Sequence, residues 1–194
     1  MTLKYRILPD PDPENPRDWD NLGIMCCFHK RYNLGDHHTL LLAGREGWAE
    51  LEQHLVEEEG ALYILPLFLY DHSGITMNTT SFSCGWDSGQ VGFIYATKET
   101  IESTGVAPEN VEAGLIDEVK TYDQYLTGDV WGYEVYLVET CNKGHEHEEI
   151  IHSCWGFYDE SDAENEAKCL AVNDEPFHPS DPMPEDWNNK EPLS

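Results

Sequence analysis

The chain has 194 residues, and its 38 aspartates and glutamates against 11 lysines and arginines give a formal net charge of −27. Its length suits one domain with or without a tail, and an apolar fraction of 40% is enough to build a core. Because nucleic acids and anionic membrane surfaces are themselves negatively charged, this composition argues against direct binding to either.

The first half of the chain predicts more strands than helices. Alternation and apolar runs indicate strands at 3–8, 24–29, 61–70, 75–83 and 90–97. Between the second and third of these, Trp48, Leu51 and Leu55 recur at helical spacing, and Gly60 ends that helix. The third strand is apolar at both its odd and its even positions, which predicts a central strand covered on both faces.

The second half contains the clearest helix of the chain. After Pro108, apolar residues recur at helical spacing from Val111 to Leu126, and Gly128 ends the helix. Thr97 or Ser103 can cap a shorter helical region before it.

A predicted β-hairpin follows this helix. Residues 130–139 and 148–158 flank the turn residues 142–144. The order of elements predicts an α+β fold, with a mixed, mostly antiparallel sheet and helices packed on one face.

Beyond the hairpin the composition becomes acidic and rich in proline. We therefore expect one α+β domain at residues 1–158 and an acidic C-terminal tail at 159–194. Within the tail, 162–170 can form one short helix, and the chain is expected to be mobile from about residue 173.

The six cysteines are expected to be reduced. The first residues lack an apolar export signal, and no run of about 18 apolar residues predicts a membrane span. Cys26, Cys27, Cys84 and Cys154 lie beside apolar or aromatic residues, as buried thiols do. These features favour a cytoplasmic protein.

Asp71, His72 and Asp87 are the candidate catalytic residues. Asp71 and His72 follow the most buried predicted strand, where functional sites often form. Carboxylates and an imidazole can hold a divalent ion that activates water, with Asp20 as a further candidate ligand. Neighbouring strand residues face opposite sides, so Asp71 and His72 can act together only across a turn. The alternative is a hairpin turn without chemistry.

Two further segments carry metal-binding residue types. Cys141, His145 and His147 form a zinc-type cluster at the hairpin tip, with a solvated turn as the alternative. Carboxylates alternate along residues 10–20 as calcium ligands do, but the sixth loop position is Asn15 instead of glycine. We expect no cofactor, with zinc and calcium as the alternatives.

The helix after Pro108 carries a candidate binding face. Its acidic residues are Glu109, Glu112, Asp117, Glu118 and Asp123. An anionic face of this kind attracts a positively charged protein and speeds its association. The simpler explanations of the net charge are solubility and adaptation to high salt.

Six strings of the sequence together resemble a family of small proteins from bacteriophages and other mobile genetic elements. They lie at residues 19–23, 31–36, 69–75, 86–92, 122–128 and 153–158. The resemblance covers about residues 5–158 and implies the cytoplasm of a phage-infected or plasmid-bearing bacterium. It implies no activity and assigns no functional residue.

The sequence as a whole favours a non-catalytic binding protein. We expect its acidic surface to occupy a basic cleft of a nucleic-acid-handling host or phage protein, as anti-restriction and anti-CRISPR inhibitors and DNA mimics do. One alternative is a metal-assisted hydrolase that uses Asp71, His72 and Asp87. Another is a phage structural or accessory protein that assembles with itself.

Overall fold

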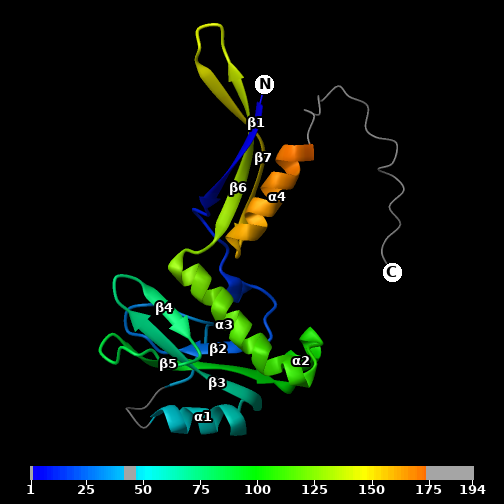
Figure 1. Ribbon diagram of the computed structural model, residues 1–194. Helices are drawn as coiled ribbons and strands as arrows, with labels where there is room; N and C mark the ends of the chain where they lie inside the picture. The colour runs from blue at the N-terminus through cyan, green and yellow to red at the C-terminus, as the bar shows by residue number, and fades with distance from the viewer. Residues whose placement is uncertain (1, 42–46, 174–194) are drawn as a thin grey trace.

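The larger of two antiparallel sheets has four strands. The computed structural model describes residues 2–41 and 47–173 (Figure 1). The strands lie in the order β2 (Ile24–Cys27), β5 (Ser88–Thr97), β3 (Ala61–Asp71) and β4 (Ile75–Asn78). Pro66 lies in the part of β3 that pairs with β5 but not with β4, so its missing N–H interrupts no second ladder.

Helices cover both faces of this larger sheet. The helices are α1 (Gly47–Glu57), α2 (Lys98–Thr104), α3 (Val111–Thr127) and α4 (Glu160–Asn173), with 3-10 turns η1 (Pro16–Asp18) and η2 (Pro108–Asn110). Leu115 of α3 shares one core with Ile94 of β5, whereas Leu55 of α1 shares another with Phe93. Figure 1 shows α3 on one side of the sheet and α1 on the other. Neighbouring residues of β5 thus enter different cores, as successive strand residues must.

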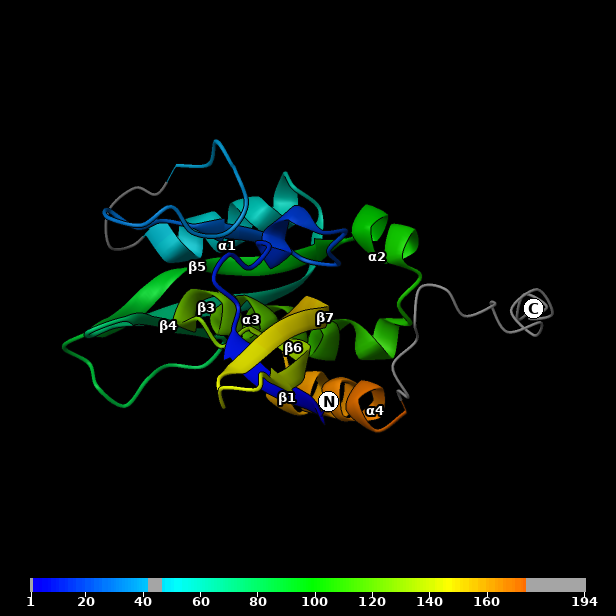
Figure 2. The same cartoon turned by 90° about the horizontal axis from the view of Figure 1, so that it is seen from above.

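The smaller sheet has three strands and is covered by α4. Its strands lie in the order β1 (Thr2–Pro9), β6 (Trp131–Thr140) and β7 (Glu146–Phe157). Ala163 and Ala167 of α4 are fully buried against Tyr133 and Val135 of β6. The Tyr133 hydroxyl donates to Glu166 at 2.9 Å. The small alanines let the helix lie close to the sheet, and Figure 2 shows the two side by side.

The two sheets meet at a junction centred on Tyr158. Its ring packs edge-on against Trp19, with 5.4 Å between the ring centroids, and its hydroxyl donates to the Glu14 carbonyl at 2.9 Å. Gln124 of α3 donates its side-chain N–H to the Tyr158 carbonyl. Residues before β2, on α3 and after β7 are therefore held together here.

The α+β class and the antiparallel pairing are confirmed. The strands form two sheets instead of one, and α1 and α3 lie on opposite faces of the larger one, not on a single face. The division follows from a long-range pairing that local patterns do not reveal, since Tyr5 of β1 lies opposite Val135 of β6.

Most expected local elements are present. The Thr97 cap is confirmed as a capping box with Thr100, and the strand expected at 75–83 ends at Asn78. The helix expected at 162–170 is α4, which packs on the smaller sheet. The mobile segment expected from about residue 173 lies outside the described residues.

Buried tyrosines make stability sensitive to alkaline pH. Burial raises the pKa of Tyr95 to about 12, with the Glu59 carboxylate adding to the effect; an ordinary tyrosine has a pKa of about 10. The folded state therefore keeps this proton after the unfolded state has lost it. We expect the free energy of unfolding to be constant with respect to this group below pH ~10 and to fall from there towards pH ~12. Urea denaturation at a series of alkaline pH values measures the slope.

Tyr95→Phe is the matching variant for this prediction. It removes the titrating hydroxyl, so the alkaline loss of stability is expected to become shallower. Tyr133, whose pKa burial also raises to about 12, accounts for part of the slope that remains. Identical slopes for the two proteins would contradict the assignment to Tyr95.

Candidate functional site

The predicted catalytic residues lie together at one corner of the larger sheet. Asp71 ends β3 and Asp87 immediately precedes β5, and the Asp71 N–H donates to the Asp87 carbonyl at 2.8 Å. The chain turns at residues 72–74, where the His72 N–H donates to the Gly74 carbonyl at 3.0 Å and Ser73 has a φ of 59°. The predicted turn therefore brings His72 towards Asp87, at the start of β5.

Asp71 and His72 have different partners. His72 Nδ1 lies 3.2 Å from Asp87 Oδ2, and the two side chains are 62% and 41% exposed. Asp71 instead forms an ion pair with Arg31 and accepts a hydrogen bond from the Tyr32 hydroxyl at 3.4 Å. The dyad of this corner is thus His72–Asp87, while the Asp71 carboxylate is neutralised by a guanidinium.

The loop after β2 supplies residues that the sequence reasoning missed. His29 Nδ1 accepts the backbone N–H groups of Arg31 and Tyr32, at 3.3 and 3.2 Å. The imidazole of His29 also stacks on the Tyr32 ring, with 4.9 Å between centroids. The available signal was the run of cationic and aromatic residues at 29–32, which is unusual in so acidic a chain.

His29, Arg31, Asp71 and Asp87 line an open hollow of about 370 Å³, whereas His72 lines a separate hollow on the side of β4. Trp86 lies at its rim and is 97% exposed, which leaves its indole free to stack on a bound group. The corner can therefore hydrogen-bond and stack on a polar ligand. Of the three predicted catalytic residues, His72 and Asp87 remain for general acid–base work, because Asp71 is paired with Arg31. In the described part of the chain, no contact links Asp20 to this corner.

The cysteine–histidine cluster lies at the β6–β7 turn, as predicted. The Cys141 N–H donates to the His145 carbonyl at 2.9 Å, and His147 lies opposite Glu139 in the ladder. Backbone N–H groups of Lys143 and His145 lower the pKa of the Cys141 thiol. Across residues 2–41 and 47–173, no group of three His, Cys, Asp or Glu side chains is arranged to hold a metal ion. Zinc at this turn therefore stays a prediction, as does calcium.

The acidic loop at residues 10–20 is organised by its own side chains. The Asp12 N–H donates to the Asp10 carboxylate and the Arg17 N–H to the Asn15 side chain, both at 3.0 Å. Such turns are typical of Asp and Asn in irregular segments.

The acidic residues of the α3 region divide into two groups. Glu109, Glu112 and Asp117 are exposed. Asp123 instead accepts the Met77 N–H at 2.6 Å and so fixes α3 to β4. Glu118 is also used within the fold. The binding face predicted on this helix is therefore reduced to its three exposed members, which we call the α3 acidic face.

Glu118 belongs to a partly buried ion network with Arg17 and Asp36. Arg17, whose side chain is only 3% exposed, lies 2.7 Å from Asp36 and 3.1 Å from Glu118, and it also donates to the Gly23 carbonyl. Glu118 accepts the N–H groups of Leu22 and Gly23 in addition. Burial lowers the pKa of the Arg17 guanidinium, but the hydrogen bonds and charges of Asp36 and Glu118 outweigh it and the net shift is upward. The network thus keeps its cation charged.

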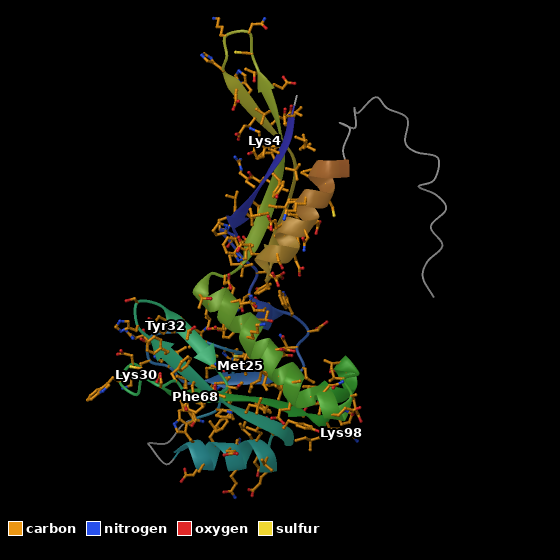
Figure 3. The ribbon with its side chains drawn as sticks, viewed as in Figure 1. Lys4, Met25, Lys30, Tyr32, Phe68 and Lys98 are labelled. Carbon is orange, nitrogen blue, oxygen red and sulfur yellow. The ribbon has the colours of Figure 1, made fainter. Side chains whose placement is uncertain are left out.

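The cationic residues of the described chain are dispersed. Figure 3 shows Lys4 on β1, Lys30 in the loop after β2 and Lys98 at the start of α2, in three separate parts of the molecule. Within residues 2–41 and 47–173, five of the lysines and arginines form ion pairs with carboxylates, namely Arg6, Arg17, Arg31, Lys98 and Lys168. No concentrated cationic groove therefore forms from the described residues.

Comparisons with protein-family models, curated proteins and solved structures yield no match to this chain. Among the described helices, none combines the length and the apolar character that crossing a membrane requires.

Proposed function

We propose that this chain is a non-catalytic binding protein whose acidic exterior docks on a basic, nucleic-acid-handling protein. The observation that carries the proposal is the distribution of charge: a net −27 is combined with cationic side chains that are dispersed or already paired. Such a surface repels a phosphate backbone and attracts the proteins that bind one. Occupation of a basic cleft in a restriction or CRISPR protein, by imitation of nucleic acid, fits this charge and the phage-like resemblance.

The α3 acidic face is the part of the surface that best suits such docking. Glu112 and Asp117 lie on α3, and Glu109 lies on the 3-10 turn η2 directly before it. Because Leu115 and Glu118 fix α3 to the rest of the fold, these carboxylates are presented without a large ordering cost. Ile116 and Trp19, 42% and 41% exposed, lie on and beside the same helix. Exposed apolar groups within an acidic surface can anchor a protein partner.

Capture from a nuclease-treated bacterial lysate tests the proposal. The immobilised protein is expected to retain basic nucleic-acid-binding proteins at low salt and to release them at high salt, because screening weakens charge-driven binding. Added duplex DNA is expected to compete for the same partners. Recovery of no basic partner, or retention that is indifferent to salt, would overturn it. Stable self-assembly in light scattering would instead favour a phage structural or accessory protein.

Charge reversal locates the binding face. The triple variant Glu109→Lys, Glu112→Lys and Asp117→Lys is expected to weaken binding to the captured partner by about tenfold or more, from loss of attraction and gain of repulsion. Titration of the purified partner measures it.

The matched control makes the same change of charge on α1 and the turn that follows it, through Glu52→Lys, Glu57→Lys and Glu58→Lys. These three carboxylates are also exposed, but they lie on the opposite face of the larger sheet. Equal losses in the two triple variants would mean that net charge, and not the α3 acidic face, determines the affinity.

The convergence of His72 and Asp87 favours a second candidate, a metal-assisted hydrolase. A divalent ion bound there would shift the NMR signals of the His72 imidazole during a metal titration. His72→Gln should abolish the response. Absence of any shift would end this alternative.

A further inference from the structure

β7 is an edge strand. Its first residues pair regularly with β6 on their inner side, and their outer side faces no strand of the described residues. The register shifts at Ile151 and again at Gly156, where the ladder is bulged. Residues Glu146–Ile150 pair regularly with Tyr136–Thr140 and so present an uninterrupted row of outward backbone groups.

This stretch is sterically accessible. Each of its residues is exposed, and Ile150 is 51% exposed although it is a large apolar residue. Figure 1 shows the tip of the β6–β7 hairpin extending beyond α4 and away from the larger sheet. Nothing in the described chain therefore prevents another strand from lying against it.

The charge of this stretch indicates which kind of strand can pair with it. Glu146, Glu148 and Glu149 occupy three of its five positions, and neither Lys nor Pro, which often protect natural edges, is among them. Pairing with a second copy of β7 would bring six glutamates together between two chains of charge −27. Glu148 already pairs with Arg6, and an extended segment with lysines or arginines would neutralise Glu146 and Glu149 and add to the pairing of Glu148.

We propose that residues Glu146–Ile150 of β7 form a docking edge for an extended basic segment of the partner, which adds a fourth strand to the smaller sheet. This inference rests on the proposed function, which makes the partner basic, and adds where and how one of its segments binds. Main-chain hydrogen bonds supply the affinity and alternate side chains the selectivity. A cation of the added strand lies beside Glu146, on the face of the sheet where Glu148 already pairs with Arg6 and where Ile150 contacts an apolar residue of the added strand.

A synthetic peptide of alternating lysine and valine is the probe. It is expected to bind the full chain and to slow amide hydrogen exchange within residues 146–150. A peptide of alternating lysine and proline has the same charge but cannot complete a ladder, and it is expected to bind about tenfold more weakly. Neutralising β7 through Glu146→Gln, Glu148→Gln and Glu149→Gln is expected to weaken binding of the lysine–valine peptide by about tenfold or more.

The matched control changes Glu52 and Glu57 of α1 and Glu58 directly after it to glutamine. It removes three charges elsewhere on the molecule and is expected to retain the affinity. Equal weakening in both triple variants, or unchanged hydrogen exchange at 146–150, would overturn the docking edge while leaving an acidic binding protein intact. Dimerisation that the β7 variant abolishes in sedimentation would replace the basic segment by a second copy. Failure of every basic probe and partner to bind would instead refute the proposed function.

Discussion

Arg17→Met is expected to lower the free energy of unfolding by about 3–5 kcal/mol, the range observed when one member of a buried ion pair is removed. The guanidinium neutralises Asp36 and Glu118 and also satisfies the Gly23 carbonyl, all within a site where Arg17 is 3% exposed. Methionine fills the volume but leaves two carboxylates close together with no cation between them. Urea denaturation at neutral pH and constant salt measures the loss.

Arg6→Met is the control for this prediction. Arg6 also pairs with two carboxylates, Glu134 and Glu148, but its side chain is 39% exposed. Water already screens the exposed Arg6 guanidinium and the Glu148 carboxylate, which is 47% exposed, so a smaller loss of stability is expected than for Arg17. Equal losses in the two variants would show that burial adds nothing to the Arg17 network.

The Arg17 network also connects stability with the proposed function. It fixes the segment between β1 and β2 to one side of α3, because Glu118 accepts the backbone N–H groups of Leu22 and Gly23. Since α3 cannot rotate about its axis without breaking this attachment, the network also holds Glu112 and Asp117 in their exposed positions. A charged residue inside the fold thus determines which carboxylates face a partner.

Local elements of the fold could be predicted because their signals are local. The helical spacing of Leu115 and Val119, the cap at Thr97 and the turn after Asp71 each depend on a few neighbouring residues. Division into two sheets depends instead on β1 pairing with β6, a choice that the alternation of Leu3–Leu8 does not contain. Alternation shows that a strand has two faces but not which strand lies beside it.

The sequence-based binding face included two residues that the fold uses internally. Glu118 lies three positions after Leu115 and four before Tyr122, so it is next to the buried stripe of α3, and Asp123 lies four positions after the buried Val119. The helical spacing by itself therefore indicates that Glu118 and Asp123 lie beside the buried side of α3. The partners that explain their burial, such as Arg17 and Met77, come from distant segments and could not be deduced.

Convergence of the candidate catalytic residues was only partly predictable. The turn after Asp71 could be inferred, but the pairing of His72 with Asp87 required the alignment of β3 with β5. Neutralisation of Asp71 by Arg31 required the position of the loop after β2. Side chains near in sequence thus obtained different partners because each partner arrives through a separate tertiary contact.

Gly92→Ala is expected to destabilise the protein by about 3 kcal/mol or more, at or above the upper end of typical overpacking costs. A Cβ at Gly92 would lie 2.0 Å from the Cys26 carbonyl oxygen on β2. Because the obstacle is backbone, no side-chain rotation can relieve it, and β2 must separate from β5. That separation disturbs both cores. Met25 belongs to the core between the sheet and α3, and Cys26 belongs to the core between the sheet and α1. Thermal and urea denaturation measure the effect.

Gly89→Ala, in the same strand, is the matched control. A Cβ at Gly89 meets no atom within 4 Å, and this glycine has no positive φ. Alanine there restricts the unfolded chain without a clash, so a gain of about 0.4–1 kcal/mol is expected. Similar stability changes in the two variants would mean that the close approach of β2 to β5 at Gly92 is not required. A large loss confined to Gly92→Ala would show that this glycine sets the spacing between the two strands and, through it, the joining of the two cores.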